Sequence, residues 1–359
     1  MPVTSTTRAT EPVLHRAARA EDALNRTLAR LLHRRGWRPR IIAYTGYGSS
    51  AVDGSTGWVR VLARVLLSPP GVGDREDTGT RGWRHFVAAK LGGVPVTVEV
   101  GGRRHVVESG RGGYVDAVLE SDAPPGWTTA RLCVAQAEQV EAPLRVVGPD
   151  ERLGVVSDID DTVLITALPR PLLAFWNTFV RPEESRRPVP GMADLYRALL
   201  RHHPDAFVVY VSTGAWNLAP ALTRFLHRRG FPAGPLLMTD WGPTPDGWFR
   251  SGQQHKRATL RRLVDDLPQL RWVLVGDDGQ HDPQLYDEIA WARPAEVRLV
   301  AIRQLAVTEQ VLTHGTPLPL PGPPRGAGSG RRVPWLHAPD GHALVAELRG
   351  RADADELLR

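Results

Sequence analysis

The chain has 359 residues, of which 42% are hydrophobic, and its formal net charge at pH 7 is +6. This length allows two globular domains with real cores. A single cysteine excludes an internal disulfide and a cysteine-based zinc cluster. No signal-peptide core and no run near the roughly 18 apolar residues of a membrane span are found, so we expect a soluble, cytoplasmic protein. The positive charge suits an anionic partner, although a codon bias toward arginine explains it equally well.

The first segment, residues 1–37, predicts an amphipathic helix over residues 13–35. Leucine and alanine recur near helical spacing, and Gly36 ends the pattern. The opposite face is rich in arginine. Such a helix either packs on its own domain with a solvated basic face, which we favour, or makes peripheral contact with an anionic membrane.

Residues 38–149 predict an all-β, sandwich-like domain, with closure into a barrel left open. Short runs that often alternate apolar and polar residues are separated by turns rich in glycine and proline. The expected strands are residues 40–44, 57–67, 94–100, 105–108, 113–119 and 128–135.

One motif in this domain imitates a dinucleotide-binding fingerprint. Residues 44–51, Tyr-Thr-Gly-Tyr-Gly-Ser-Ser-Ala, follow an apolar strand and match the pattern G-x-G-x-x-A. That motif requires a helix to begin at once, because the helix N-terminus holds the pyrophosphate. Residues 52–57 are rich in glycine and break helices, so we reject this site.

Residues 150–308 predict an α/β domain with a doubly wound parallel sheet. Compact apolar runs of parallel-strand type alternate with helical stretches. The expected strands are residues 154–157, 207–211, 236–238, 272–275 and 297–302, and the expected helices are residues 192–202, 216–229, 255–267 and 282–293. Residues 309–359 predict a linker rich in proline and glycine and a tail helix over residues 341–358.

Polar residues follow the strands of this α/β domain in a regular order. Ligands and catalytic groups of an open α/β sheet collect at the carboxyl ends of its strands. The first strand is followed by Asp158, Asp160 and Thr162, and the second strand is followed by Ser212 and Thr213. Further along the chain, a helix opens with Lys256, and another strand ends in Asp277 and Asp278. Each group alone is more often a solvated loop, a cap or a surface charge, but four groups in this order are hard to attribute to chance.

The residue types suit phosphoryl transfer. Crowded carboxylates repel each other, and a hard cation such as Mg²⁺ relieves the repulsion with oxygen ligands. One carboxylate could attack phosphorus while a second moves the proton. Ser212 could donate a hydrogen bond to a phosphoryl oxygen, and Lys256 could offset the charge that develops on the transferring group.

These residues resemble the four motifs of the haloacid-dehalogenase superfamily: Asp-x-Asp-x-Thr, a Ser or Thr, a Lys, and Gly-Asp-x-x-x-x-Asp. The resemblance covers roughly residues 153–304. A closer resemblance is to the App1-type phosphatidate phosphatases, which are related to the catalytic part of lipins. It is carried by residues 157–162, 188–192 and 276–282, and extends to 231–235 and to Tyr-Thr-Gly-Tyr-Gly at residues 44–48.

The resemblance implies a role for each residue. Asp158 is expected to form an aspartyl-phosphate, and Asp160 to protonate the leaving alkoxide and then activate water. Ser212 and Thr213 are expected to contact the substrate. Lys256 is expected to hold the nucleophile and the phosphate together. The expected metal ligands are Asp158, the backbone carbonyl of Asp160, and Asp277, directly or through water, with Asp282 supporting the loop. The sequence does not cleanly separate Asp277 from Asp278 as the ligand.

The resemblance also implies hydrolysis of a phosphomonoester, with phosphatidate as the expected substrate and diacylglycerol as product. An apolar segment before Gly191 predicts either a lid that meets acyl chains or a helix buried on the domain. Two alternatives remain: a phosphatase of a soluble phosphomonoester, and a lipid- or protein-binding module with a decayed site. No nucleic-acid partner is expected, because no basic motif rich in aromatic residues is found.

Overall fold

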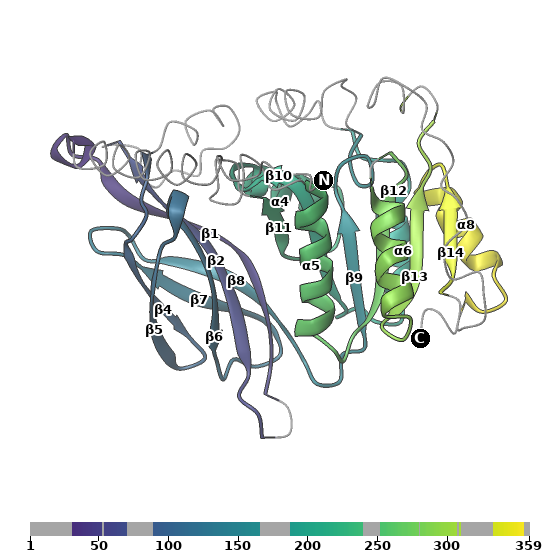
Figure 1. The fold of residues 1–359 in the computed structure, drawn as a ribbon, viewed down its shortest axis with the longest axis horizontal. Coiled ribbons are helices and arrows are strands. Elements are labelled where there is room, and N and C mark those ends of the chain that lie inside the picture. The colour runs from purple at the N-terminus through teal and green to yellow at the C-terminus, as the bar shows by residue number, and fades with distance from the viewer. Residues whose placement is uncertain are drawn as a thin grey trace, which may run out of the picture.

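The computed structural model contains two β-sheets that lie side by side (Figure 1). It describes residues 31–51, 54–69, 89–165, 187–239, 252–279, 281–306, 309 and 333–354. The first sheet is mixed and has eight strands, whereas the second is parallel and has six. Among the described residues, no helix is both long enough and apolar enough to cross a membrane.

Some strands of the first sheet bury every second residue, whereas β2 is buried along nearly its whole length. In β4, for example, Val96, Val98 and Val100 are buried, while the residues between them are more exposed, as expected for a sheet with one face in the core. The strand order is β3-β2-β1-β8-β7-β4-β5, and β6 also pairs with β2. The strands are β1 (Arg38–Ser49), β2 (Trp58–Ser68), β3 (Ala89–Lys90), β4 (Pro95–Val100), β5 (Arg103–Glu108), β6 (Tyr114–Glu120), β7 (Gly126–Cys133) and β8 (Val140–Val147).

The two ends of this sheet approach each other. Arg103 on β5 forms an ion pair of 3.0 Å with Glu120 on β6, and the His105 Nε2 atom lies 2.9 Å from the Glu120 carbonyl oxygen. The eight strands therefore form one curved, nearly closed, barrel-like sheet. The sandwich-like arrangement of two stacked sheets is not what the strands adopt, because β1 pairs with both β2 and β8 and so joins the two halves.

The second sheet has the order β11-β10-β9-β12-β13-β14, and all its strand pairs are parallel. Its central strand β9 is buried along its whole length. The chain moves outward from β9 to β10 on one side and later to β12 on the other, so a crevice is expected at the carboxyl end of β9. The strands are β9 (Leu153–Asp158), β10 (Phe207–Ala215), β11 (Leu236–Thr239), β12 (Arg271–Asp277), β13 (Val297–Arg303) and β14 (Trp335–Ala338).

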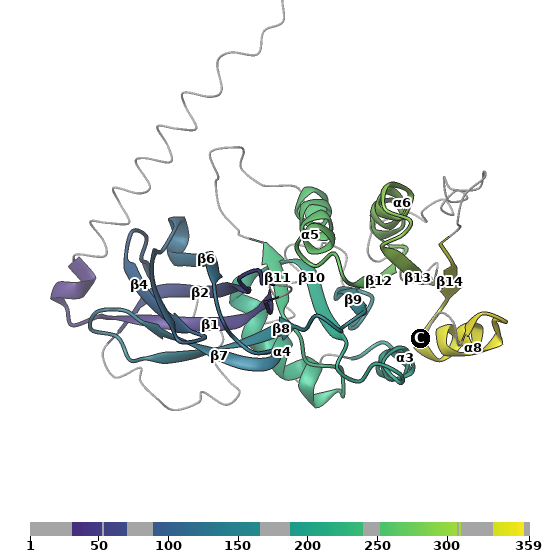
Figure 2. The same ribbon diagram turned by 90° about the horizontal axis from the view of Figure 1, so that it is seen from below.

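Helices cover both faces of the second sheet, which gives an α/β arrangement (Figure 2). Helices α5 and α6 lie on one face, and α3, α4 and α8 on the other. Each buries an apolar stripe, as Leu222, Phe225 and Leu226 do in α4. The helices are α3 (Met192–Leu199), α4 (Ala219–Arg228), α5 (Gly252–Asp266), α6 (Asp282–Ala292) and α8 (Gly341–Gly350), and a 3-10 turn, η4 (Trp216–Leu218), precedes α4.

The two sheets share part of their cores. Tyr44, Tyr47, Leu62 and Val147 come from the first sheet but belong to the hydrophobic cluster of the second. A separate cluster fills the interior of the first sheet alone. The second sheet is therefore buried on one side by β1, β2 and β8 of the first.

The expected strands of both segments are present, and three further strands, the two-residue β3, β8 and β14, were not predicted. Glu141, Pro143 and Arg145 interrupt the apolar pattern of β8, and β14 is a short run after a proline- and glycine-rich stretch. The predicted N-terminal helix falls mainly on residues 1–30, outside the described residues, although residues 31–34 are helical. The predicted lid falls on residues 166–186, which are also outside them. The tail helix starts at Gly341 as predicted and ends at Gly350.

Candidate active site

The carboxyl end of β9 carries Asp158, whose side chain is buried and only 1% exposed. Asp161 follows in the left-handed backbone region, with a φ of 57°, in a tight turn in which its amide donates to the Leu164 carbonyl oxygen at 2.9 Å. A residue other than glycine in this region marks a constrained backbone. The turn therefore spans residues 159–164, directly after Asp158.

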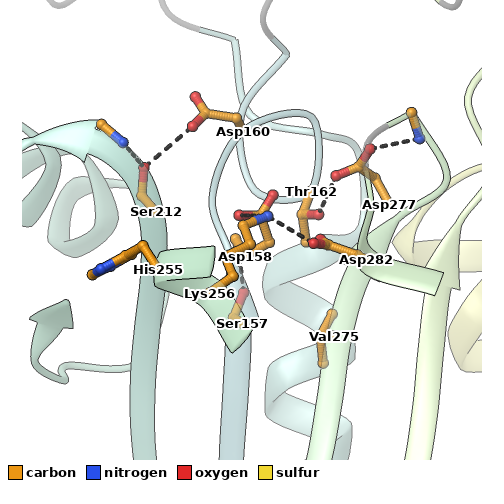
Figure 3. A network of polar contacts seen from close by, with 12 residues as sticks. Ser157, Asp158, Asp160, Thr162, Ser212, His255, Lys256, Val275, Asp277 and Asp282 are labelled. Atoms are coloured by element: carbon orange, nitrogen blue, oxygen red, sulfur yellow. Dashed lines mark hydrogen bonds and ion pairs between the residues drawn. The ribbon is translucent and has the colours of Figure 1, made fainter. Parts of the chain in front are cut away.

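Lys256 lies between two aspartates in the centre of the site (Figure 3). Its Nζ atom is 2.7 Å from Asp158 Oδ1 and 2.7 Å from Asp282 Oδ1. All three side chains are buried, so these ion pairs are shielded from solvent screening. Lys256 is the fifth residue of α5, a helix that packs against β10. Lys256 is one of only two lysines in a chain that otherwise uses arginine.

Asp277 and Asp282 enter the site from the other side, through the end of β12 and the start of α6. The Asp277 carboxylate accepts hydrogen bonds from the Gly279 amide at 2.7 Å and from the Thr162 hydroxyl at 3.3 Å. Asp282 reaches inward over Gly276, where a Cβ atom would lie 2.6 Å from Asp282 Oδ2. Glycine at position 276 is therefore what lets the first turn of α6 point a carboxylate at Lys256.

Asp160 occupies the β10 side of the site. The Ser212 hydroxyl donates to Asp160 Oδ2 at 3.2 Å and accepts a hydrogen bond from the Gly214 amide at 3.0 Å. Asp160 Oδ1 accepts no hydrogen bond from the described residues. Figure 3 shows Asp160 apart from the Asp158–Lys256–Asp282 group, at the upper edge of the site.

Two of the predicted site residues, Asp278 and Thr213, have their contacts outside the group of carboxylates around Lys256. The Asp278 Oδ1 atom accepts a hydrogen bond of 2.7 Å from the Leu305 amide, so this carboxylate holds the loop after β13. Thr213 packs its methyl group against the start of α5, where a Cβ on Gly252 would lie 2.6 Å from it, and its carbonyl oxygen accepts from the Thr239 hydroxyl at 2.6 Å.

Burial shapes the protonation of the acidic groups. It raises the pKa of Asp158 to about 8, although Lys256 opposes the shift, and the pKa of Asp160 to about 7. Burial and the nearby carboxylates of Asp282 and Asp158 raise the pKa of Asp277 well above its ordinary value. Burial lowers the pKa of Lys256, but Asp158, Asp282 and Asp277 together raise it well above its usual range. Lys256 therefore stays protonated, and its single positive charge does not balance the carboxylates around it.

The same residues fit a metal ion. One carboxylate oxygen each from Asp158, Asp277 and Asp282 lie within 4.8 Å of one another. The second oxygens of Asp158 and Asp282, both Oδ2, accept no hydrogen bond from the described residues. Buried, unpaired carboxylate oxygens are costly unless a cation binds them. A hard divalent cation with oxygen ligands matches this set.

The sequence predicted most of this group, but gave Asp282 only a supporting role and left Asp278 as an alternative metal ligand to Asp277. In the structure Asp282 completes the close group of carboxylates, whereas Asp278 faces the β13 loop. A turn separates Asp277 at the end of β12 from Asp282 at the start of α6. The sequence does not show that this turn points Asp282 back to the sheet. The scarcity of lysine was a usable signal for Lys256.

Residues 153–304 match a family model described as the catalytic domain of phosphatidate phosphatase APP1. Phosphatidate phosphatase APP1 of Saccharomyces cerevisiae is 27% identical over 153 residues, which cover 42% of this chain and 26% of that protein. An uncharacterized protein of Schizosaccharomyces pombe is 26% identical over 155 residues, covering 43% of this chain and 25% of that protein. The chain therefore spans about a quarter of the length of these curated relatives.

A solved structure of a glycosyl hydrolase family 2 member from Bacteroides cellulosilyticus is 10% identical and covers 76% of this chain and 36% of that one. Its TM-score is 0.22, so the likeness carries no argument about fold or function. The resemblance expected from the motifs is confirmed by the family match and the yeast relative. Together these matches show that residues 153–304 are similar to the catalytic domain of phosphatidate phosphatase APP1.

Proposed function

We propose that this chain hydrolyses a phosphomonoester through an aspartyl-phosphate on Asp158, with help from Mg²⁺. The observation that carries the proposal is the convergence of Asp158 and Asp277, from two separate strands, on a buried site that also holds Lys256 and Asp282. This placement, at the carboxyl ends of neighbouring parallel strands, supports a catalytic domain of the haloacid-dehalogenase type, with residues 150–308 as its extent and the β-rich residues 38–149 as a separate domain.

In the first half of the reaction, Asp158 Oδ2 forms a bond to phosphorus and the bond between phosphorus and the ester oxygen breaks. Asp158 Oδ1 is held by Lys256 at 2.7 Å, which orients the free oxygen. The leaving alkoxide takes a proton from Asp160, whose pKa is raised by burial to about 7, so a large fraction of Asp160 carries that proton at neutral pH.

In the second half, Asp160 accepts a proton from water while the water oxygen attacks phosphorus. The bond between phosphorus and Asp158 breaks, which releases phosphate and restores the carboxylate. Ser212 acts in both halves of the reaction by holding Asp160. Its hydroxyl donates to Asp160 Oδ2, and the Gly214 amide fixes the position of that hydroxyl. Lys256 stays protonated throughout and offsets negative charge on the phosphoryl oxygens.

Asp158, Asp277 and Asp282 are the residues we propose to hold the cation. When bound, Mg²⁺ supplies positive charge that favours the ionised form of Asp158 and offsets the charge of the phosphoryl group. Asp277 is preferred to Asp278, because Asp278 Oδ1 is already bonded to the Leu305 amide. Asp160 is preferred as the acid and base, because its Oδ2 atom accepts a hydrogen bond from the Ser212 hydroxyl.

Phosphatidate is the substrate we propose, on the strength of the match to the App1 catalytic domain. The net charge of +6 suits an anionic lipid headgroup and peripheral contact with an anionic membrane. We propose a cytoplasmic location for this activity.

The test is phosphate release by the wild type and by Asp158→Asn, with Mg²⁺ and with EDTA. We expect the wild type to release phosphate only with Mg²⁺, and Asp158→Asn to lose turnover because an amide cannot attack phosphorus. Asp122→Asn is the matched control, since Asp122 is an exposed aspartate on the first sheet that pairs with Arg103. Equal activity of Asp158→Asn and wild type would overturn the proposal.

Comparing rates on phosphatidate in mixed micelles and on p-nitrophenyl phosphate separates a lipid substrate from a soluble one. A protein that binds anionic vesicles but releases no phosphate from either ester with Mg²⁺ would be a binding module instead.

A further inference from the structure

Strand β1 runs along the second sheet from its catalytic end to its opposite end. Near the catalytic end, the rings of Tyr44 and Trp216 are 4.7 Å apart. Farther along, Tyr47 lies 5.9 Å from Phe207, at the start of β10. The Tyr47 hydroxyl donates to Asp266 at the end of α5, at 3.1 Å. Two residues of β1 that are three positions apart therefore contact the start of β10 and the 3-10 turn that follows its end.

The contact at the catalytic end involves the segment that directly follows Ser212. Trp216 and Asn217 form η4, four and five residues after Ser212. The Asn217 Oδ1 atom accepts a hydrogen bond from the Arg64 Nη1 group on β2. Trp216 packs on Tyr44 of β1. The first sheet thus holds the chain just beyond the hydroxyl that binds Asp160.

Arg64 is itself held firmly on the first sheet. Its Nε group donates to the Gly112 carbonyl oxygen at 3.1 Å, and its guanidinium carbon lies 4.4 Å from the centre of the Tyr114 ring. The residue is 6% exposed. A guanidinium fixed by a hydrogen bond and a stacking contact loses little entropy when it binds a further acceptor, so Arg64 offers Asn217 a rigid donor.

We propose that Arg64 and Tyr44 of the β-rich segment are positioning residues for Ser212, acting through Asn217 and Trp216. The inference rests on the proposed phosphatase function. Ser212 bridges Asp160 and the Gly214 amide with two hydrogen bonds, so a shift of the segment from Ser212 to Asn217 weakens both. Misplacing a catalytic group by about 1 Å can cost about 100-fold in rate. The motif at residues 44–48 then serves to attach the first sheet to the active site.

The test compares two variants that each remove a hydrogen bond between the sheets. Asn217→Ala removes the acceptor of Arg64 at the catalytic end. Tyr47→Phe keeps the ring but removes the hydroxyl, which donates to Asp266 at the opposite end and accepts from Arg60 Nη1 within the first sheet. We expect Asn217→Ala to lower kcat on p-nitrophenyl phosphate about 10- to 100-fold, while Tyr47→Phe keeps the wild-type kcat. Both are expected to lower Tm by similar amounts, and Asn217→Asp, which retains an acceptor for Arg64, is expected to keep most of the activity.

A second readout does not depend on activity. Hydrogen exchange of the peptide that contains residues 212–217 reports the Gly214 amide, which is bonded to the Ser212 hydroxyl. Asn217→Ala is expected to accelerate this exchange and Tyr47→Phe to leave it unchanged. Unchanged exchange in Asn217→Ala, or an equal loss of kcat in both variants, would overturn the positioning role. An inactive wild type would count against the phosphatase function, and the exchange result would still decide the positioning role.

Discussion

Asp158, Asp160, Asp277 and Asp282 place four carboxyl groups in a buried region where, among the described residues, Lys256 is the ammonium group that pairs with two of them. Burying ionised groups without a matching opposite charge is unfavourable, so some of these carboxyls hold protons in the metal-free protein. The excess of negative charge is the physical reason for the raised pKa values. It is also the reason that a cation should bind.

This charge excess predicts how stability depends on pH. Burial raises the pKa of Asp158 to about 8 and that of Asp160 to about 7, above the ordinary 3.8. Between these values the folded protein binds more protons than the unfolded chain, so the free energy of unfolding falls as pH rises. Without divalent cations, we expect Tm to decrease from about pH 5 to about pH 8, as measured by calorimetry with EDTA.

Two comparisons assign the effect to the site. Asp158→Asn should flatten the decrease, because an amide does not titrate. Addition of Mg²⁺ should raise Tm more at the higher pH, where more carboxylates are ionised and available as ligands. A Tm that rises over this range without metal, or an equal Mg²⁺ effect at both ends, would contradict the interpretation.

At the scale of secondary-structure elements, the site depends on how closely α6 approaches the end of β12. A Cβ atom on Gly276 would lie 2.6 Å from Asp282 Oδ2 and 2.8 Å from Tyr286 Cε2. The Tyr286 hydroxyl also donates to the Val275 carbonyl oxygen at 3.0 Å, which fixes α6 against the strand. A side chain at position 276 must push Asp282 away from Lys256.

Gly276→Ala is therefore expected to cost about 1–3 kcal/mol of stability through overpacking and to weaken Mg²⁺ binding. The measurements are chemical denaturation and the Mg²⁺ concentration that gives half-maximal phosphate release. Gly154→Ala is the matched control, since its Cβ would lie 2.6 Å from the Trp272 ring at the other end of the sheet. It should lose similar stability and keep the Mg²⁺ dependence. Equal Mg²⁺ dependence in the two variants would argue against a role for Asp282.

Most of the elements were predictable from sequence, apart from β3, β8 and β14, whereas the side chains that point into the site were predictable only in part. Apolar runs such as Val208–Val211 and Trp272–Val275 identify buried parallel strands, and the residues after them must meet at one edge of the sheet. The metal-ligand choice between Asp277 and Asp278 depends on a single peptide turn, which periodicity does not encode. Likewise, nothing local in the sequence links Arg64 to Asn217, because the two are brought together only by the packing of the sheets.

At the scale of the whole molecule, the two sheets are joined by buried side chains as well as by polar contacts. Leu62 on β2 is 2% exposed and belongs to the cluster of the second sheet. Arg145 on β8 pairs with Glu151 at 2.6 Å and also donates to the Asp205 carbonyl oxygen before β10. Such contacts favour unfolding of both sheets in one cooperative transition.

Leu62→Ala should lower the free energy of unfolding by about 2–5 kcal/mol and accelerate hydrogen exchange in both sheets. The comparison variant is Val98→Ala, whose side chain is fully buried in the cluster of the first sheet alone. It should accelerate exchange in β4 and β7 more than in β12. If Leu62→Ala affected only the first sheet, or if calorimetry resolved two transitions in the wild type, the sheets would be independent.

The shared core also determines where a stable fragment that contains residues 153–304 should begin. The recognised homology starts at residue 153, yet Tyr44, Tyr47 and Leu62 fill space beneath the strands of that region. A fragment that began at residue 153 would lose the aromatic and aliphatic side chains that pack on one side of the second sheet. Its apolar surface there would be exposed to water. A fragment that keeps this packing starts with the preceding β-rich segment, more than 100 residues before the matched region begins.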